Sequence, residues 1–83
     1  MSTLDQLVNG QIQTAPINID AMTQEELAQA ALHPALHADV KMYASLLHSA
    51  HHARKDGNIT RALALETRAD YTYSAHIPTH LQW

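Results

Sequence analysis

Apolar residues recur at helical spacing through the middle of the chain. Between residues 34 and 55 they alternate steps of four and three: Leu36, Val40, Tyr43, Leu47 and Ala50. At about 100° per residue, such steps place all members on one side of a helix. The pattern therefore predicts a long amphipathic helix from about Pro34 to Lys55, with this apolar stripe facing the core.

A capping pattern marks the start of a shorter helix before this one. Thr23 is followed by Glu26 at the spacing of a capping box, so a helix is expected to begin at Thr23. Proline suits the first turn of a helix and clashes inside one, so Pro34 predicts that the short helix ends near Leu32. A single helix kinked at Pro34 is the alternative.

A glycine stop after the long helix predicts a helical hairpin. Gly57 ends the long helix, and Asn58 caps a second one. The second helix is expected from about Ile59 to Ser74, because Pro78 prevents its continuation. The face that we expect to turn inward carries apolar side chains and two carboxylates: Ile59, Ala62, Leu63, Glu66, Ala69, Asp70 and Tyr73.

An arm is expected before the helices. Residues 1–20 are interpreted as this arm, with one or two helical turns over residues 2–10. An extended segment around Pro16 follows, because proline and the residue before it favour extended backbone. Ile12, Ile17 and Ile19 in this segment are candidates for docking on another part of the protein.

The helical domain is expected to span residues 21–83 and to end in a tail. Residues 76–83 are too few for another full helix, so we expect them to pack Leu81 and Trp83 onto the hairpin. The sequence thus predicts an all-α fold: a small helical domain with a long helix and an antiparallel helical hairpin, an extended N-terminal segment and a short C-terminal tail.

The composition predicts a thin core. A single domain of 83 residues buries only about 60% of the surface that its unfolded chain exposes, so its stability is marginal. The chain has no Phe, and large aromatic side chains dominate the energetics of cores and interfaces. We therefore expect its few large anchors to bind another protein or a second copy of the chain: Tyr43, Tyr71, Tyr73, Leu81 and Trp83.

The absence of cysteine indicates in which cellular compartment the protein is expected. Without cysteine there is no disulfide framework and no thiolate metal site, which favours a reducing setting, so the cytoplasm is the expected location. The N-terminal segment lacks a basic region followed by an apolar run. No stretch approaches the roughly 20 apolar residues needed to cross a bilayer. We expect neither export nor a membrane partner.

Charge is unevenly distributed along the chain. The net charge is −3, whereas a nucleic-acid-binding surface needs clustered Lys and Arg, so no nucleic-acid partner is expected. Residues 1–40 contain five acidic residues and no Lys or Arg, and all five basic residues lie between Lys41 and Arg68. This asymmetry either pairs the two halves within one chain or across an oligomer, or is an accident of composition.

Histidine is the residue type that most invites a metal hypothesis. Five of the seven histidines lie on or just before the long helix, and pairs spaced by four residues can chelate one ion. In the expected hairpin, His48 lies opposite Glu66 and Ala44 lies opposite Asp70. One hypothesis is therefore a divalent transition metal bound by four side chains: His48, His52, Glu66 and Asp70.

Two further interpretations of these side chains remain open. In the first, the imidazoles are surface residues and the carboxylates pair with Arg54, Lys55 or His48. In the second, protonation of the clustered imidazoles between about pH 7 and pH 5 adds charge beside the apolar stripe and loosens an oligomer.

The sequence favours interaction over catalysis. It contains no Gly-rich phosphate loop, nucleophile elbow, HExxH motif or thiol, so we expect neither enzymatic activity nor a cofactor. A thin core and an amphipathic helix instead favour a non-catalytic protein–protein interaction module that forms a homodimer or another homo-oligomer. An adaptor, an accessory subunit or a small inhibitor of a larger complex, including a phage-encoded one, fits this description.

Overall fold

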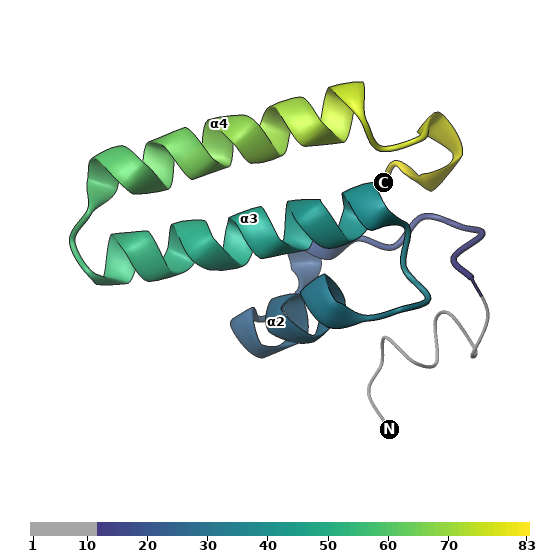
Figure 1. Cartoon of the computed structure of the whole chain (residues 1–83), viewed down its shortest axis with the longest axis horizontal. Coiled ribbons are helices and arrows are strands. Elements are labelled where there is room, and N and C mark those ends of the chain that lie inside the picture. The colour runs from purple at the N-terminus through teal and green to yellow at the C-terminus, as the bar shows by residue number, and fades with distance from the viewer. Residues whose placement is uncertain (1–11) are drawn as a thin grey trace.

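The computed structural model describes residues 12–83, which form three α-helices, two short 3-10 helices and no strand (Figure 1). The elements follow in the order η1 (Ile19–Ala21), α2 (Gln24–Leu32), α3 (Ala38–Lys55), α4 (Ile59–Ala75) and η2 (Thr79–Leu81). The predicted all-α fold is confirmed, and α3 and α4 form the antiparallel hairpin. The helical turns predicted over residues 2–10 lie outside the described part of the chain. No helix in residues 12–83 combines the length and apolarity needed to cross a membrane.

The predicted capping box begins α2. The Glu26 backbone N–H donates to the Thr23 hydroxyl at 3.2 Å, and the Thr23 backbone N–H donates to the Glu26 carboxylate at 3.0 Å. These two bonds satisfy donors that have no partner inside the helix. Leu27 and Ala30 on the inner face of α2 are buried against α3.

The chain breaks between α2 and α3 instead of continuing as one kinked helix. As predicted, α2 ends at Leu32, before Pro34. However, α3 begins at Ala38, four residues after the expected start at Pro34. The cause is a local cap, because the His37 imidazole Nδ1 accepts a hydrogen bond from the Asp39 backbone N–H at 3.1 Å.

The described part of the arm packs on the helices. Ile17 and Ile19 are buried as predicted, whereas the prediction was wrong for Ile12, whose side chain is exposed. Buried Gln13 joins the arm to the loop before α3: its side-chain carbonyl accepts from the His37 N–H at 3.3 Å, and its backbone N–H donates to Ala35 at 2.7 Å. These bonds satisfy polar groups that burial would otherwise leave without partners.

The apolar stripe of α3 faces the core as predicted, but the contact face of α4 differs from the prediction. On α3 and just before it, Leu36, Val40, Tyr43 and Ala50 are buried and Leu47 is partly buried. On α4 the buried side chains are those of Ala62, Ala69 and Thr72, whereas Ile59 and Leu63 are about half exposed. The prediction is therefore confirmed for Ala62 and Ala69 and wrong for Ile59 and Leu63, because small residues allow the closest helix approach.

The hairpin turn and the tail match the expectations. Gly57 adopts a φ of 82°, a left-handed conformation that suits glycine, and the Asn58 side chain caps α4 by accepting from the Arg61 N–H at 3.1 Å. In the tail, Leu81 is fully buried. The Gln82 side-chain amide donates to two backbone carbonyls, those of Tyr73 at 3.1 Å and of Ile77 at 3.0 Å.

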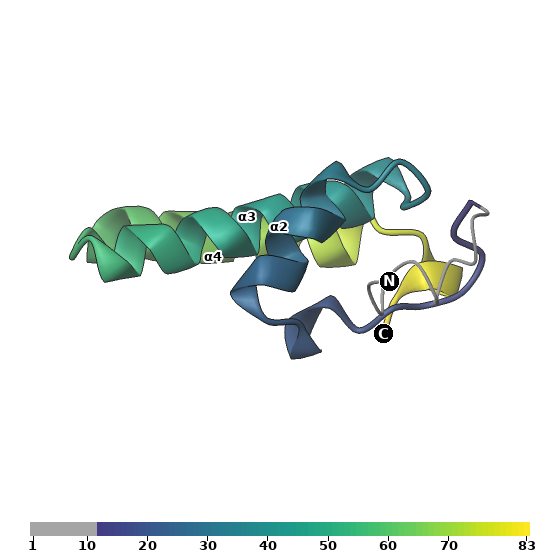
Figure 2. The same ribbon diagram turned by 90° about the horizontal axis from the view of Figure 1, so that it is seen from below.

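The molecule has two layers of unequal extent. The hairpin forms one layer, and the arm, α2 and the tail form a second layer that covers only part of one side of the hairpin (Figure 2). Residues 47–68, the projecting half of the hairpin, extend beyond this second layer. The larger buried side chains gather at the other end, and the buried residues of the projecting half are alanines: Ala50, Ala53 and Ala62.

We expect Thr23→Ala to lower the free energy of unfolding by about 1 kcal/mol, because it removes the side-chain acceptor of the capping box. Urea denaturation followed by circular dichroism measures this change. Thr67→Ala, at an exposed position within α4, is the matched control and should change stability by less than about half as much. Equal effects of the two substitutions would contradict the capping role.

Candidate functional site

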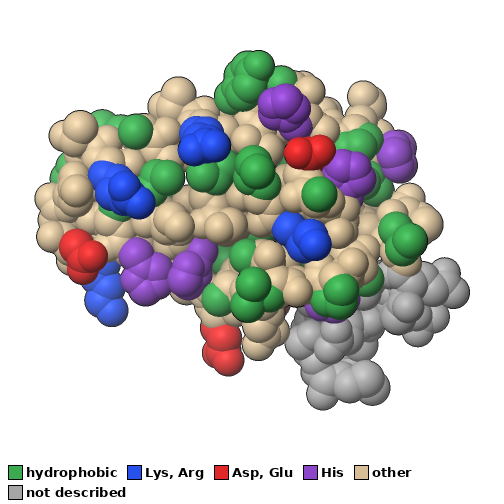
Figure 3. All heavy atoms as spheres, in the orientation of Figure 1, with side chains coloured by type: hydrophobic (Ala, Val, Ile, Leu, Met, Phe, Trp, Pro, Cys, Tyr) green, Lys and Arg blue, Asp and Glu red, His purple; other side chains and the backbone are tan. Residues whose placement is uncertain are grey.

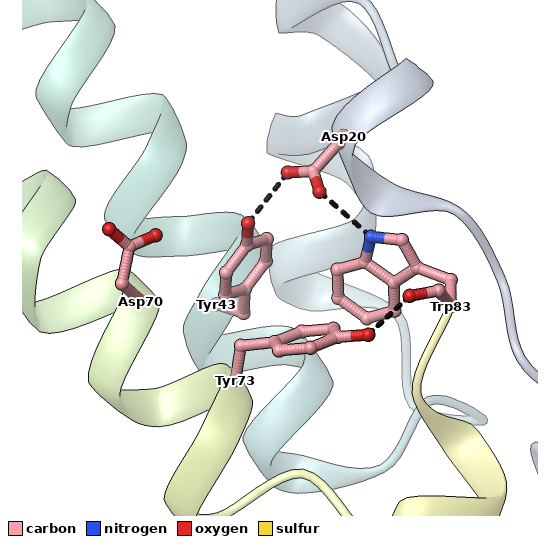
Figure 4. Close-up of a pocket in the computed structure, with 5 residues that line it drawn as sticks. All are labelled: Asp20, Tyr43, Asp70, Tyr73 and Trp83. Atoms are coloured by element: carbon pink, nitrogen blue, oxygen red, sulfur yellow. Dashed lines mark hydrogen bonds between the residues drawn. The ribbon is translucent and has the colours of Figure 1, made fainter.

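A cluster of three aromatic rings and two carboxylates lies where η1 and the C-terminal tail meet the hairpin. Asp20 comes from η1, Tyr43 from α3, Asp70 and Tyr73 from α4, and Trp83 from the tail after η2. These five residues line a pocket of about 370 Å³ (Figure 4). We refer to it as the aromatic pocket.

Hydrogen bonds fix the positions of the rings. The Asp20 carboxylate accepts from the Tyr43 hydroxyl at 2.6 Å through one oxygen and from the Trp83 indole N–H at 2.8 Å through the other. The Tyr73 hydroxyl donates to the backbone carbonyl of Trp83. The carboxylate therefore joins η1 both to α3, 23 residues away, and to the tail, 63 residues away.

The three rings pack edge to face. Ring centroids are 5.0 Å apart for Tyr43 and Trp83, 4.7 Å for Tyr73 and Trp83, and 6.0 Å for the two tyrosines. The interplanar angles lie between 57° and 76°, within the tilted and T-shaped geometry that aromatic pairs prefer. The rings therefore form a packed wall, and the carboxylates of Asp20 and Asp70 lie at its edges (Figure 4).

The electrostatic environment of this pocket is negative. Burial raises the pKa of the Tyr43 hydroxyl well above its usual value, and the hydrogen bond to Asp20 and the negative charges of Asp20 and Asp70 raise it further. All of these effects disfavour the phenolate. Tyr43 therefore stays protonated and donates its hydrogen bond throughout the ordinary pH range.

A second polar group lies on the projecting half of the hairpin. Arg54 donates two hydrogen bonds to Glu66, from Nε at 2.9 Å and from a terminal nitrogen at 2.6 Å. This bidentate pairing lowers the pKa of Glu66. The interpretation that these carboxylates pair with basic neighbours is therefore confirmed for Glu66, whereas the side chain of Asp70 has no hydrogen bond or ion pair within residues 12–83.

The proposed metal ligands do not converge in the described part of the chain. His48 and His52 lie side by side, with their Nε2 atoms 3.3 Å apart, and adjacent histidines are visible on the α3 side of the hairpin in Figure 3. Glu66 binds Arg54 instead, and Asp70 lines the aromatic pocket. Residues 12–83 contain no group of three or more His, Asp or Glu side chains arranged to hold a metal ion.

The structure separates the five predicted partner-binding residues into three groups. Tyr43 and Leu81 are buried in the core, with 5% and 1% of their surface exposed. Tyr73 and Trp83 are partly buried and form the wall of the aromatic pocket. Tyr71 is 61% exposed, and its ring contacts only that of His76 among the described residues.

Sequence reasoning missed Asp20 as a site residue. It was counted only as one of the acids of the first half, and its partners Tyr43 and Trp83 are 23 and 63 residues away. No local spacing connects residues at such separations. The available signal was indirect: Asp20 follows the alternating Ile17 and Ile19, which dock the arm on the core.

Comparisons with known proteins give no further assignment: no family model, no curated protein and no solved structure matches this chain. The functional argument therefore depends on the arrangement of the residues themselves.

We expect the protein to lose stability at alkaline pH through Tyr43. The pKa of this hydroxyl is higher in the folded than in the unfolded chain, so its contribution is complete below about pH 10 and is lost as the pH rises further. Between about pH 9 and pH 11, the free energy of unfolding of the wild type should fall by about 1 kcal/mol more than that of Tyr43→Phe.

Urea denaturation at the two pH values measures this difference. Tyr71→Phe, which alters a mostly exposed tyrosine, should follow the wild type. If Tyr43→Phe loses as much stability as the wild type, the environment inferred for Tyr43 is wrong.

Proposed function

We propose that this chain is a non-catalytic protein–protein interaction module that associates with a second copy of itself through the projecting half of its hairpin. The observation that carries the proposal is an apolar face on residues 47–68 with no second layer over it. Adaptors, accessory subunits and small inhibitors of larger assemblies all use such modules.

The Arg54–Glu66 ion pair identifies this face. Because the two side chains bind each other, they lie on the same side of the hairpin. At about 100° per residue, Ile59 and Leu63 lie within about 60° of Glu66 on α4. Ile59 is 47% exposed and Leu63 is 52% exposed. Exposed apolar side chains therefore lie beside the ion pair.

The contact between α3 and α4 explains why a partner would stabilise the projecting half. Its fully buried side chains are alanines, which bury little surface, and the larger Ile59 and Leu63 remain about half exposed. Fully burying an exposed Leu or Ile contributes roughly 2 kcal/mol. Two such hairpins packed face to face form a four-helix arrangement, in which these side chains become the shared core.

The distribution of charge favours a second copy as the partner. The projecting half carries four basic and two acidic residues, whereas the remaining described residues carry one basic and five acidic ones. Within residues 12–83, no ion pair joins a Lys or Arg of the projecting half to an acidic residue of the remainder. The charge asymmetry is therefore not compensated within the described chain. It would be compensated in a two-fold symmetric dimer in which the basic projecting half of each copy contacts the acidic end of the other.

The predicted anchors keep a place in this proposal. Tyr71 offers an exposed ring to a partner, whereas Tyr73 and Trp83 form the wall of the aromatic pocket, away from the projecting half. Tyr43 and Leu81 contribute by holding the tail and α3 in position.

We expect the wild type to form a dimer of twice its 9.2 kDa monomer mass and Leu63→Lys to be monomeric. Lysine and leucine have similar helix propensities and Leu63 is half exposed, so the substitution should leave the monomer folded. Sedimentation velocity over a concentration series, with circular dichroism as the test of folding, measures both properties.

Ala64→Lys is the matched control, because it adds the same charge at an exposed position about 100° away around α4. It should remain dimeric. High salt should weaken the wild-type dimer through screening of the crossed charges. A wild type that stays monomeric at every concentration, or a Leu63→Lys variant that dimerises like Ala64→Lys, would refute association through this face.

A further inference from the structure

The aromatic pocket has an unusual lining. It is formed by the rings of Tyr43, Tyr73 and Trp83 and the carboxylates of Asp20 and Asp70, and no Lys, Arg or His is among the lining residues. Its volume of about 370 Å³ lies at the small end of the range for ligand pockets. The pocket is therefore both aromatic and acidic.

Neither carboxylate is neutralised by a cation. Asp20 accepts hydrogen bonds from a phenol and an indole, which are neutral donors and leave its negative charge in place. The Asp70 carboxylate has no hydrogen bond or ion pair within residues 12–83, and it lies beside Tyr43 (Figure 4). Both charges act on the Tyr43 hydroxyl and contribute to its raised pKa. Two uncompensated charges thus converge on one small volume.

The rings add a preference for a particular kind of cation. The face of an aromatic ring carries partial negative charge and attracts ammonium groups, most strongly in tryptophan. A metal ion such as Ca²⁺ instead requires six to eight oxygen ligands, and residues 12–83 offer no cluster of three metal-binding side chains. An ammonium group carrying alkyl substituents can contact rings and carboxylates together.

We propose that the aromatic pocket is a binding site for an alkylammonium cation, whose positive charge lies between Asp20 and Asp70 while its methyl or methylene groups contact Tyr73 and Trp83. This site is independent of the association proposed for the hairpin, because it lies at the opposite end of α3 and α4 from the turn. The failure of one proposal leaves the other intact.

Fluorescence offers a direct test, because Trp83 is the single tryptophan of the chain and lies in the pocket wall. The full-length protein is titrated with choline at constant ionic strength, with sodium chloride as the balancing salt. A parallel titration uses 3,3-dimethylbutan-1-ol, the uncharged carbon analogue of choline. We expect a saturable change with choline, with a dissociation constant on the order of 1 mM, and none with the alcohol or with sodium.

Two pairs of variants separate charge from ring contact. Asp70→Asn removes one charge without breaking a hydrogen bond of the described chain and should weaken choline binding about tenfold, whereas Asp56→Asn, in the hairpin turn, should not change it. Tyr73→Leu should weaken binding by a similar factor, whereas Tyr71→Leu, which removes an exposed ring outside the pocket, should not change it.

A second set of ligands tests whether the cation is a free amine or a side chain of a partner protein. Butylammonium presents the group as a free amine, and N-acetyl-lysine N-methylamide presents it as a protein side chain. Tighter binding of the lysine derivative assigns the pocket to a side chain of a partner protein, and equal or weaker binding assigns it to a free amine.

Three results would overturn the proposal. They are no saturable response to any ammonium ligand, equal binding of choline and its uncharged analogue, and unchanged choline binding by Asp70→Asn.

Discussion

The carboxylate of Asp20 is the interaction on which the shape of this molecule depends. It accepts hydrogen bonds from Tyr43 and Trp83, and so it holds the arm, the long helix and the tail in one place. A buried tyrosine hydroxyl and an indole N–H each need a partner, and one carboxylate satisfies both. The same arrangement leaves a negative charge beside three aromatic rings. The Asp20 carboxylate therefore contributes both to folding and to the chemistry of the aromatic pocket.

This chain is too short for its other segments to cover both sides of the long hairpin. They cover one side only, and only at one end of it. The arm, α2 and the tail supply a second layer there, with the larger core side chains between the layers. In the projecting half the fully buried residues are alanines, and the Arg54–Glu66 pair joins the two helices there. The molecule therefore divides into a packed acidic end that carries the pocket and a thinner basic end suited to association.

Local patterns predicted the local structure, and long-range contacts account for what they missed. The capping box at Thr23, the turn at Gly57 and the stripe of α3 depend on residues a few positions apart, so they could be read from the sequence. The inner face of α4 was misassigned because the apolar pattern favoured Leu63, whereas small residues govern how closely two helices approach. The pocket joins residues from four separate segments, and no spacing rule links Asp20 to Trp83.

The alanines between α3 and α4 also act as a spacer that sets the dimensions of the pocket. Ala62 and Ala69 are fully buried, so the distance between the two helix backbones is fixed by methyl groups. Tyr43 lies on α3, and Asp70 and Tyr73 lie on α4. A larger residue at either alanine would move the helices apart and separate the opposing walls. Residues that never touch a ligand would thus determine how large a ligand can be.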